Sequence, residues 1–546
     1  MNAVSGAPVM PDLSERAFRV GLGLALALGA VLWVAFQRGT GIVLEDALIT
    51  FRFAGNLAEG RGFAFNPGEP VLGTTTPLFT LLLAALGRLV GVGAIPDMAR
   101  CVLLLSGLAT ILFTTMALVR LRAGRVAALA SAFLFALHPD IAWTTAGGME
   151  TTFVLFLMAG SLWALSAGRE VLAGLLAGLL VLARPDGLVW AGLVLATLVP
   201  WRRGQAWRAI LAFAAVVGAW GAYALATFGS VVPQTVVAKA TTVGPASPLH
   251  FLRPIAVRVY ATYFAGWLPF PPEGGLSILS FAIGLALALL GGRALVRVSA
   301  HPARFLLAVF PFAFAGAYYV GQAPRSFPWY GIPFTWAVLA LTGVGLAAAG
   351  AFLGNRARAG AGTKGLAIAT GSAVVLVLAA SLGAGLVRTF AYERAFQENE
   401  IAGRRRIGEW IATHTPPDAR IAMEAIGYQA YYSRRPVIDL AGLVTPEVTR
   451  LRRGARSNAE VYRRIFDDLG PDLIVLRSFE VDTNRHRDGG PFFESDETRT
   501  GFARVYKEEL RVTVPHPELW AEGASLTVYR RVAPGRMADQ THREGS

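Results

Sequence analysis

The sequence predicts an α-helical protein that crosses a membrane many times and ends in a soluble α/β domain. Of its 546 residues, 54% are hydrophobic and only 16% are charged. The mean hydropathy of +0.49 is too high for a soluble protein of this length. Apolar runs recur through the first part of the chain, and the composition becomes that of a soluble protein from about Ala391. We therefore expect a multi-span transmembrane domain over 1–388 and an α/β domain over 389–546.

The charge is distributed unevenly along the chain. The formal net charge is +14, yet 24 basic and 24 acidic residues lie after Arg388, so the whole excess belongs to the apolar part. A surplus of Lys and Arg in short loops between spans is typical of the cytoplasmic side of a membrane protein. This distribution argues against nucleic acid as a partner. The single cysteine, Cys101, lies inside an apolar run and cannot form an intramolecular disulfide.

Eleven segments are apolar and close to the roughly 20 residues that a membrane-spanning helix needs. They lie near residues 17–37, 98–119, 124–139, 150–167, 170–184, 186–201, 208–228, 275–292, 303–321, 330–353 and 364–388. Several are short, and the pair around Arg184 could instead form a broken or re-entrant hairpin. No small-residue cleavage site follows the first span, so we expect it to stay as an anchor.

Residues 77–92 are apolar but short, and their placement decides the topology. If they crossed the bilayer, the arginines of 120–125 would lie opposite those of 16–19. If they lie in the membrane interface, the basic loops share one side. Those loops hold Arg16, Arg19, Arg120, Arg122, Arg125, Arg169, Arg202, Arg203, Arg208, Arg293, Arg297, Arg356, Arg358 and Lys364. We expect the second arrangement, in an inner or plasma membrane, with a cytoplasmic N-terminus and an extracytoplasmic C-terminal domain.

The C-terminal part has the alternating pattern of a small α/β domain. An amphipathic helix is expected at 404–414 and a second helix at 458–469. No Gly-rich phosphate loop is present, so a nucleotide-binding module is not predicted. The last residues, 534–546, are expected to form a disordered tail. Buried or half-buried strands are expected at 420–425, 436–440, 472–478, 511–514 and 525–532.

Glu45 and Asp46 are the most informative residues of the chain. Two adjacent carboxylates where the first span meets water are costly to keep there, which indicates a function. At the edge of a low-dielectric cleft a carboxylate binds protons more tightly than in water, and a second acid beside it strengthens this effect. Such a group suits a general base. The alternative is that both acids only stabilise the first turn of the next helix.

The stretch that follows the acidic pair resembles a known superfamily. The pair precedes ITFRFAGNLAEGRGFAFNPGEPV and a Thr-Thr-Pro before the interfacial segment, as in the GT-C superfamily of polyprenyl-phosphate-dependent glycosyltransferases. Within it, the sequence most resembles the terminal arabinofuranosyltransferases of mycobacterial cell-wall synthesis and their uncharacterised bacterial relatives. Further pieces in the expected order are GGMETTF (147–153), ARPDG (183–187), VVPQTVVAKA (231–240), PWYGIPF (328–334) and RPVIDLAGLVTPEV (435–448).

The resemblance implies an inverting transfer of a sugar from a polyprenyl-phosphate donor to a cell-envelope glycan, lipid or protein acceptor on the outer face. The group usually has Asp-Asp where this chain has Glu45-Asp46, which leaves open which carboxylate is the base. Neighbouring helix positions point about 100° apart, so both cannot reach one atom. We expect Asp46 to act as the base and Glu45 as its orienter or as an acceptor for a sugar hydroxyl.

Two cations are candidates for binding the phosphate of the donor. Arg184 lies on the side of the membrane where basic residues are disfavoured, which suggests an anionic partner such as a lipid phosphate. Alternatively it pairs with Asp186 and stabilises the turn between two spans. Lys239 is the second candidate, and it could equally be a solvated loop residue.

The remaining candidates are less specific. Arg52 lies seven residues after Glu45 on the same helical face, so it could orient that carboxylate or contact phosphate. Glu150 could contact the substrate or cap the next helix. In metal-using GT-C oligosaccharyltransferases a loop at this place supplies metal ligands, but Glu150 stands alone, so we expect no metal and no cofactor. Trp329 and Tyr330 could stack on the sugar or the isoprenoid, or belong to an interfacial aromatic belt.

Two other functions compete with sugar transfer. A transporter or flippase for lipid-linked sugars would also contain intramembrane charges, but it should show two similar halves, and no internal repeat is found. A membrane-anchored binding or assembly protein would act through its α/β domain and would not need Glu45 and Asp46.

Overall fold

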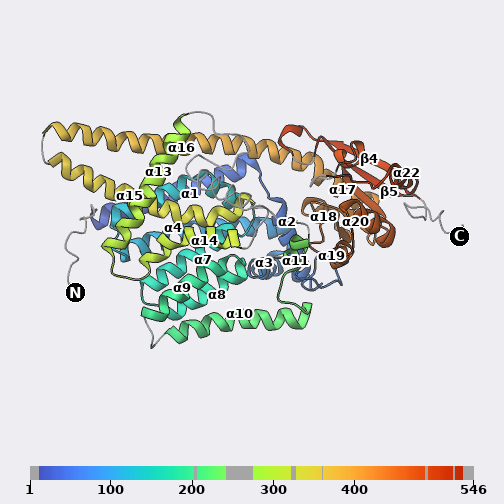
Figure 1. Ribbon diagram of the computed structural model, residues 1–546, viewed down its shortest axis with the longest axis horizontal. Coiled ribbons are helices and arrows are strands. Elements are labelled where there is room, and N and C mark those ends of the chain that lie inside the picture. The colour runs from blue at the N-terminus through green and yellow to red at the C-terminus, as the bar shows by residue number, and fades with distance from the viewer. Residues whose placement is uncertain are drawn as a thin grey trace.

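The computed structural model describes residues 12–201, 204, 206–241, 275–320, 327–358, 361–485, 490–520 and 523–532. The predicted tail at 534–546 lies outside the described residues, as do 242–274 and 321–326. Figure 1 shows a helical bundle with the α/β domain at one end. Helix α16 runs along the bundle and connects it to that domain.

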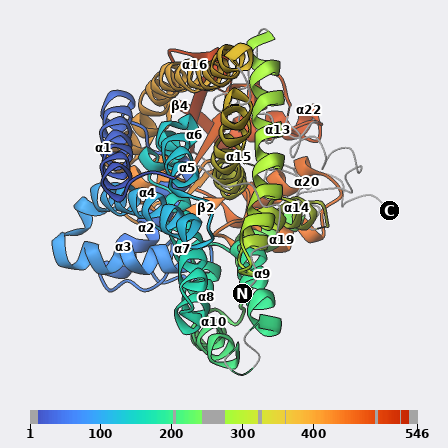
Figure 2. The ribbon, with the colours of Figure 1, turned by 90° about the vertical axis from the view of Figure 1, so that its left-hand side faces the viewer.

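All eleven predicted apolar segments form helices. Their bounds are α1 Glu15–Thr40, α4 Ile95–Arg120, α5 Arg125–Leu137, α7 Thr151–Ser166, α8 Glu170–Ala183, α9 Gly187–Trp201, α10 Ala206–Phe228, α13 Gly275–Val298, α14 Arg304–Val320, α15 Ile332–Arg358 and α16 Ala361–Glu400. Between them lie α2 Glu45–Ala58, α3 Pro77–Val90, the 3₁₀ turns η1 Val92–Ala94 and η2 Pro328–Gly331, α6 Pro139–Ala146 and α11 Gln234–Thr241. Figure 2 shows α13 and α15 packed side by side.

Within the described residues, six helices are long and apolar enough to cross a membrane, or seven if α5 and the bent α6 form one broken span. Helices α7, α8, α9 and α14 are apolar but shorter, as the sequence indicates. The protein is therefore a multi-pass membrane protein whose bundle combines full-length and shorter apolar helices.

The contacts of Arg125 agree with the prediction that 77–92 does not cross the membrane. Its guanidinium bonds to Glu15 at 2.7 Å and to the carbonyl oxygen of Leu13 at 2.9 Å. Helix α5 therefore begins beside the start of α1, so α1 and α4 span the bundle in opposite directions. The intervening α2 and α3 both belong to the other end, next to the α/β domain (Figure 1).

No helix was predicted in the segment HPDIAWTTAGGMET, between the centres of the apolar runs 124–139 and 150–167, yet its first part is helical. Residues Pro139–Ala146 form α6, which bends by 58° from α5. Pro139 is at the start of the helix, where its missing N–H costs nothing, and His138 Nδ1 accepts the N–H of Asp140 at 3.2 Å. All eight residues of α6 are buried, so the segment is packed rather than solvated.

Helix α16 continues into the C-terminal part without a break. It passes through a π-helical segment at Ile401–Arg405 into α17 at Arg406–His414, the predicted amphipathic helix. The predicted boundary at 388/389 therefore lies inside α16. Polar residues enter the helix from about Ala391, but its backbone hydrogen bonds remain regular up to the π segment.

The C-terminal domain contains a five-stranded sheet in the order β2-β1-β3-β5-β4. The first three strands are parallel, β5 is antiparallel to β3, and β4 pairs with β5. The predicted strands are confirmed, and β4 begins earlier than expected. The bounds are β1 Ile421–Met423, α18 Tyr428–Ser433, β2 Val437–Asp439, α19 Pro446–Arg453, α20 Asn458–Arg464, the π turn η4 Ile465–Leu469, β3 Leu473–Arg477, α21 Ser478–Asp482, α22 Asp496–Val505, β4 Tyr506–Thr513, η5 Pro517–Leu519 and β5 Ser525–Arg531.

One hydrophobic core joins the two parts of the chain. Phe53 of α2 and Phe65 of the segment after it pack into the same buried cluster as Ile421 of β1 and Ile407 of α17. These side chains are almost completely inaccessible to solvent. The α/β domain is therefore held against α2 by apolar contacts, in addition to the polar contacts described below.

Candidate active site

The acidic pair begins α2 where the bundle meets the α/β domain. After α1 ends, Gly41 adopts a left-handed conformation (φ 65°), which turns the chain. Leu44 N–H then bonds to the carbonyl oxygen of Gly147 at 2.8 Å, which fixes the start of α2 against the bundle. Glu45 and Asp46 both lie in the first turn, where the helix dipole favours negative charge.

Glu45 is bound to the C-terminal domain. Its carboxylate accepts the main-chain N–H of Gly427 at 2.5 Å and that of Tyr428 at 3.1 Å. Arg404 Nη1 lies 3.7 Å from the same carboxylate. Burial raises the pKa of Glu45 to about 7, and Arg404 opposes this rise. These partners give Glu45 a role in joining the domains, so it starts α2 and also anchors α18.

Asp46 has different surroundings although it is the next residue. Within the described part of the chain, no hydrogen bond or ion pair to its carboxylate is found. Burial raises its pKa above the ordinary value for aspartate, while Lys239 and, to a smaller extent, Arg404 oppose the rise. Among the described residues, the carboxylate is thus a proton acceptor with no hydrogen-bond donor.

Glu150 connects Asp46 electrostatically with Arg184. It follows Gly148, whose φ of 86° sets the turn before α7, and its side chain is buried. Burial raises the pKa of Glu150 to about 7, Arg184 opposes this rise, and Asp186 and Asp46 add to it. Glu150 takes the N-cap position of α7 but makes no side-chain capping bond there, so capping by its carboxylate does not explain its burial.

Arg184 and Asp186 form the ion pair that was the alternative to a phosphate contact. The guanidinium binds the carboxylate through two hydrogen bonds, of 2.8 and 2.5 Å, although its side chain is only 2% exposed. Arg184 also donates to the carbonyl oxygens of Trp329 (3.3 Å) and Tyr330 (3.4 Å). The pair stabilises the turn between α8 and α9 and also ties that turn to the 3₁₀ turn before α15.

Lys239 reaches the same place from α11. Its ammonium bonds to the Tyr330 hydroxyl at 3.2 Å and lies 5.4 Å from the centre of the Phe327 ring. The Trp329 indole stacks on Phe327, with ring centres 4.8 Å apart and planes inclined by 9°. The Trp329 ring also lies 6.1 Å from that of Tyr330 and 6.4 Å from that of Trp143 of α6, measured between ring centres. Cations and aromatic rings from distant segments therefore converge around Tyr330, and Lys239 also interacts electrostatically with Asp46.

Arg52 does not belong to this cluster, and its expected role is corrected. Its guanidinium donates to the carbonyl oxygens of Phe65 at 2.9 Å, Ala430 at 2.5 Å and Arg435 at 2.7 Å. None of its hydrogen bonds within the described residues reaches Glu45. The five N–H groups of a guanidinium match several carbonyl oxygens at once, so Arg52 fastens α2 to the C-terminal domain.

Arg404 and Glu400 were not identified from the sequence. Arg404 Nη1 bonds to both carboxylate oxygens of Glu400, at 2.7 and 2.9 Å, and both side chains are nearly inaccessible. Their spacing of four residues on a helix resembles an ordinary surface ion pair. The sequence carries no signal that this pair is buried against Glu45, because the contact joins positions more than 350 residues apart.

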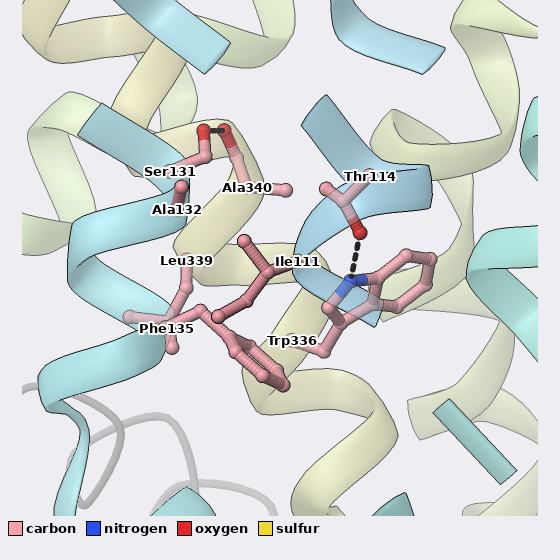
Figure 3. Close-up of a pocket in the computed structure, with 8 residues that line it drawn as sticks. All are labelled: Ile111, Thr114, Ser131, Ala132, Phe135, Trp336, Leu339 and Ala340. Atoms are coloured by element: carbon pink, nitrogen blue, oxygen red, sulfur yellow. Dashed lines mark hydrogen bonds between the residues drawn. The ribbon is translucent and has the colours of Figure 1, made fainter. Parts of the chain in front are cut away.

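A small pocket inside the bundle is chemically unlike this cluster. It lies between α4, α5 and α15 (Figure 3) and is lined by Ile111, Thr114, Ser131, Ala132, Phe135, Trp336, Leu339 and Ala340. Its polar atoms are already used, since Trp336 Nε1 donates to Thr114 and Ser131 donates to the Ala340 carbonyl. The lining has no ionisable side chain. Elsewhere in the described chain, no three His, Cys, Asp or Glu residues form a group able to hold a metal ion.

Among known protein families, one family model matches the chain, and it covers the C-terminal part. Residues 389–529 match a family model described as a domain of unknown function (DUF8728). The sequence matches none of the curated proteins with which it was compared.

The fold is similar to two kinds of solved membrane proteins. ArnT from Cupriavidus metallidurans bound to undecaprenyl phosphate has a TM-score of 0.59 at 15% sequence identity, over 96% of this chain and 100% of that one. The oligosaccharyltransferase of Archaeoglobus fulgidus in its apo form has a TM-score of 0.54 at 11% identity, over 96% of this chain and 75% of that one.

The protein therefore has the GT-C fold, as a multi-pass membrane protein with a C-terminal sheet domain. The expected fold class is confirmed. The similarity does not single out the arabinofuranosyltransferase group.

Proposed function

We propose that this protein is a glycosyltransferase that uses a polyprenyl-phosphate sugar as donor. The observation that carries the proposal is Asp46, a half-buried carboxylate with a raised pKa, which interacts electrostatically with Lys239 and with Glu150, while Glu150 in turn interacts with Arg184. A base next to cations is what transfer from a sugar phosphate requires. The GT-C fold supports this proposal, as does the ArnT complex with undecaprenyl phosphate.

In the proposed reaction, Asp46 accepts the proton of an acceptor hydroxyl. The hydroxyl oxygen attacks the anomeric carbon from the face opposite the phosphate, and the bond between that carbon and the phosphate oxygen breaks. The electron pair leaves with the polyprenyl phosphate, whose charge Lys239 and Arg184 balance. Because one displacement occurs, the configuration is inverted. Trp329 offers a ring face for the sugar or the first isoprene units.

We propose that the reaction occurs on the extracytoplasmic side. The arginines that surround the start of α1, such as Arg125, mark the opposite end of the bundle, and basic loops favour the cytoplasm. The acceptor would then be a cell-envelope glycan, lipid or protein. The motifs shared with the arabinofuranosyltransferase group make a pentofuranose the first sugar to test.

The proposal is tested by incubating the purified protein with a panel of polyprenyl-phosphate sugars, arabinofuranose included, and with glycan and lipid fractions of cell envelopes as acceptors. We expect one donor to be consumed, with release of free polyprenyl phosphate, measured by mass spectrometry. EDTA should leave the rate unchanged, because protein cations balance the leaving group. Movement of intact donor across liposomes without cleavage would instead favour a flippase, and no consumption of any donor would contradict the proposal.

Lys239→Gln should raise the donor KM by about tenfold, because one charge-assisted contact to phosphate is lost. It should also weaken binding of sugar-free undecaprenyl phosphate to a similar degree, as measured by titration in detergent. Lys507→Gln, an exposed lysine of β4, is the matched control and should behave as the wild type. Unchanged affinity in the Lys239 variant would remove this residue from the donor site.

A further inference from the structure

A buried ion network joins the start of α2 to the C-terminal domain. Glu400 holds Arg404 through both carboxylate oxygens, and Arg404 approaches Glu45 at 3.7 Å. The carboxylate of Glu45 also accepts the N–H groups of Gly427 and Tyr428. All three of these partners of Glu45 come from beyond residue 400, while its chain neighbour is Asp46.

The backbone around Arg404 is specialised for this contact. Residues Ile401–Arg405 form a π-helical segment, a feature that often occurs at functional sites because it redirects side chains. The Arg404 guanidinium lies 5.1 Å from the centre of the Trp520 ring, and Trp520 Nε1 bonds to Glu400 at 3.1 Å. Arg404 is thus fixed in place on several sides.

The contact between Glu45 and α18 leaves no room for a side chain. A Cβ atom added at Gly427 would lie 2.1 Å from the main-chain oxygen of Glu45 and 2.8 Å from its Oε1. Both of these atoms belong to the first turn of α2. The close approach shows that this turn and α18 are packed as one unit.

We propose that Arg404 and Glu45 are positioning residues, through which the C-terminal domain holds the first turn of α2 and sets the charge around Asp46. This inference rests on the proposed function, because it assigns these residues an effect on the proposed base. The C-terminal domain is then a part of the active site, and a transmembrane part expressed without it would lack an ordered base.

The direction of the electrostatic effect follows from the groups that face Asp46. Lys239 from α11 and Arg404 from the π segment lower its pKa, against burial, which raises it. Two further carboxylates lie near: Glu150, before α7, whose pKa Asp46 raises, and Glu45, which precedes Asp46 on α2. Removal of the Arg404 charge should therefore raise the pKa of Asp46. Removal of the Glu400 charge leaves the positive charge of Arg404 less neutralised, so it should lower the pKa of Asp46.

The experiment measures kcat and the donor KM across pH for Arg404→Gln, Arg404→Lys and Glu400→Gln. A base must be deprotonated to act, so the rate rises with pH through its pKa. This rising part of the pH profile is called the acid limb. We expect Arg404→Gln to move the acid limb to higher pH by about half a unit or more, and Glu400→Gln to move it to lower pH. Arg404→Lys should keep the wild-type limb, with a lower kcat and an unchanged KM. Arg405→Gln, an exposed arginine of the same π segment, is the control and should match the wild type.

Opposite shifts in the two variants cannot arise from loss of structure alone. An acid limb that stays in place in a folded Arg404→Gln or Glu400→Gln protein overturns the inference. If one of these variants fails to fold, as judged by size-exclusion chromatography, the shift of the other decides. Wild-type protein that consumes no polyprenyl-phosphate sugar contradicts the proposed function, whereas active wild type with unshifted variants contradicts only the positioning role.

Discussion

Asp46→Asn is expected to lower kcat for sugar transfer by about a thousandfold, the usual contribution of a general base. Asparagine has nearly the same shape but cannot accept the hydroxyl proton. The donor KM should change little, because Asp46 meets the acceptor hydroxyl and not the phosphate. Since burial raises the pKa of Asp46, the wild-type rate should rise with pH above the usual range of an aspartate. This acid limb should vanish from the residual activity of the variant.

The matched control is Asp97→Asn. Asp97 is also an aspartate in the first turn of a helix, but its side chain is 72% exposed and pairs with Arg100. Its replacement should leave kcat, KM and the pH profile unchanged. The assignment of the base fails if Asp46→Asn, folded as the wild type, keeps more than about a tenth of the activity or retains the acid limb.

Much of the fold could be predicted because its causes are summed over long stretches of chain. A spanning helix depends on the hydropathy of about twenty residues, so single exceptions do not hide it. The placement of residues 77–92 could be predicted for a similar reason, because only one placement puts all the basic loops on the same side of the membrane. Helix α6 was missed because its eight residues are too few to show a period, and because His138, Pro139 and the following Gly147 resemble a loop.

The candidate site could be predicted only in part. Arg184, Lys239 and Glu150 stand out because each carries a charge next to an apolar run. In the structure Lys239 and Glu150 interact electrostatically with Asp46, and Arg184 interacts with Glu150. Arg52 is also a charge on an apolar helix, so the sequence could not separate it from them. What distinguishes Arg52 is a set of carbonyl acceptors from the loop after α2 and from the C-terminal domain, and such long-range contacts leave no local pattern.

Glu45 and Asp46 also differ through long-range contacts that leave no local pattern in the sequence. They have nearly the same chemistry and adjacent positions. Helix geometry predicted that the two carboxylates point in different directions, but it did not show which of them is the base. The structure separates them through their partners. Two main-chain N–H groups and Arg404 occupy the carboxylate of Glu45, while Asp46 is influenced by Lys239.

The second large effect is expected from Arg52→Met, which should destabilise the docking of the C-terminal domain by about 3 kcal/mol or more. Methionine fills the apolar part of the space, but it removes the charged donor from the carbonyl oxygens of Ala430 and Arg435, and Ala430 keeps only the main-chain N–H of Arg434 and the Ser433 hydroxyl. Each hydrogen bond to a charged group contributes about 1.5–3 kcal/mol. Hydrogen exchange at α18 and at the edge of β2 should therefore speed up by roughly a hundredfold, because those amides open with the interface.

Arg61→Gln is the control for this experiment. Arg61 lies on the same stretch of chain, but its side chain is 47% exposed and its ion pair with Glu59 is at the surface, where such pairs contribute little. Exchange at α18 should match the wild type in this variant, and exchange in the strands β4 and β5 should stay slow in both. If Arg52→Met leaves exchange at α18 unchanged, the interface is held by the apolar cluster around Phe53 and Ile421 alone, and Arg52 is not a clamp. If exchange rises throughout the sheet, the domain depends on α2 for its folding and not only for its docking.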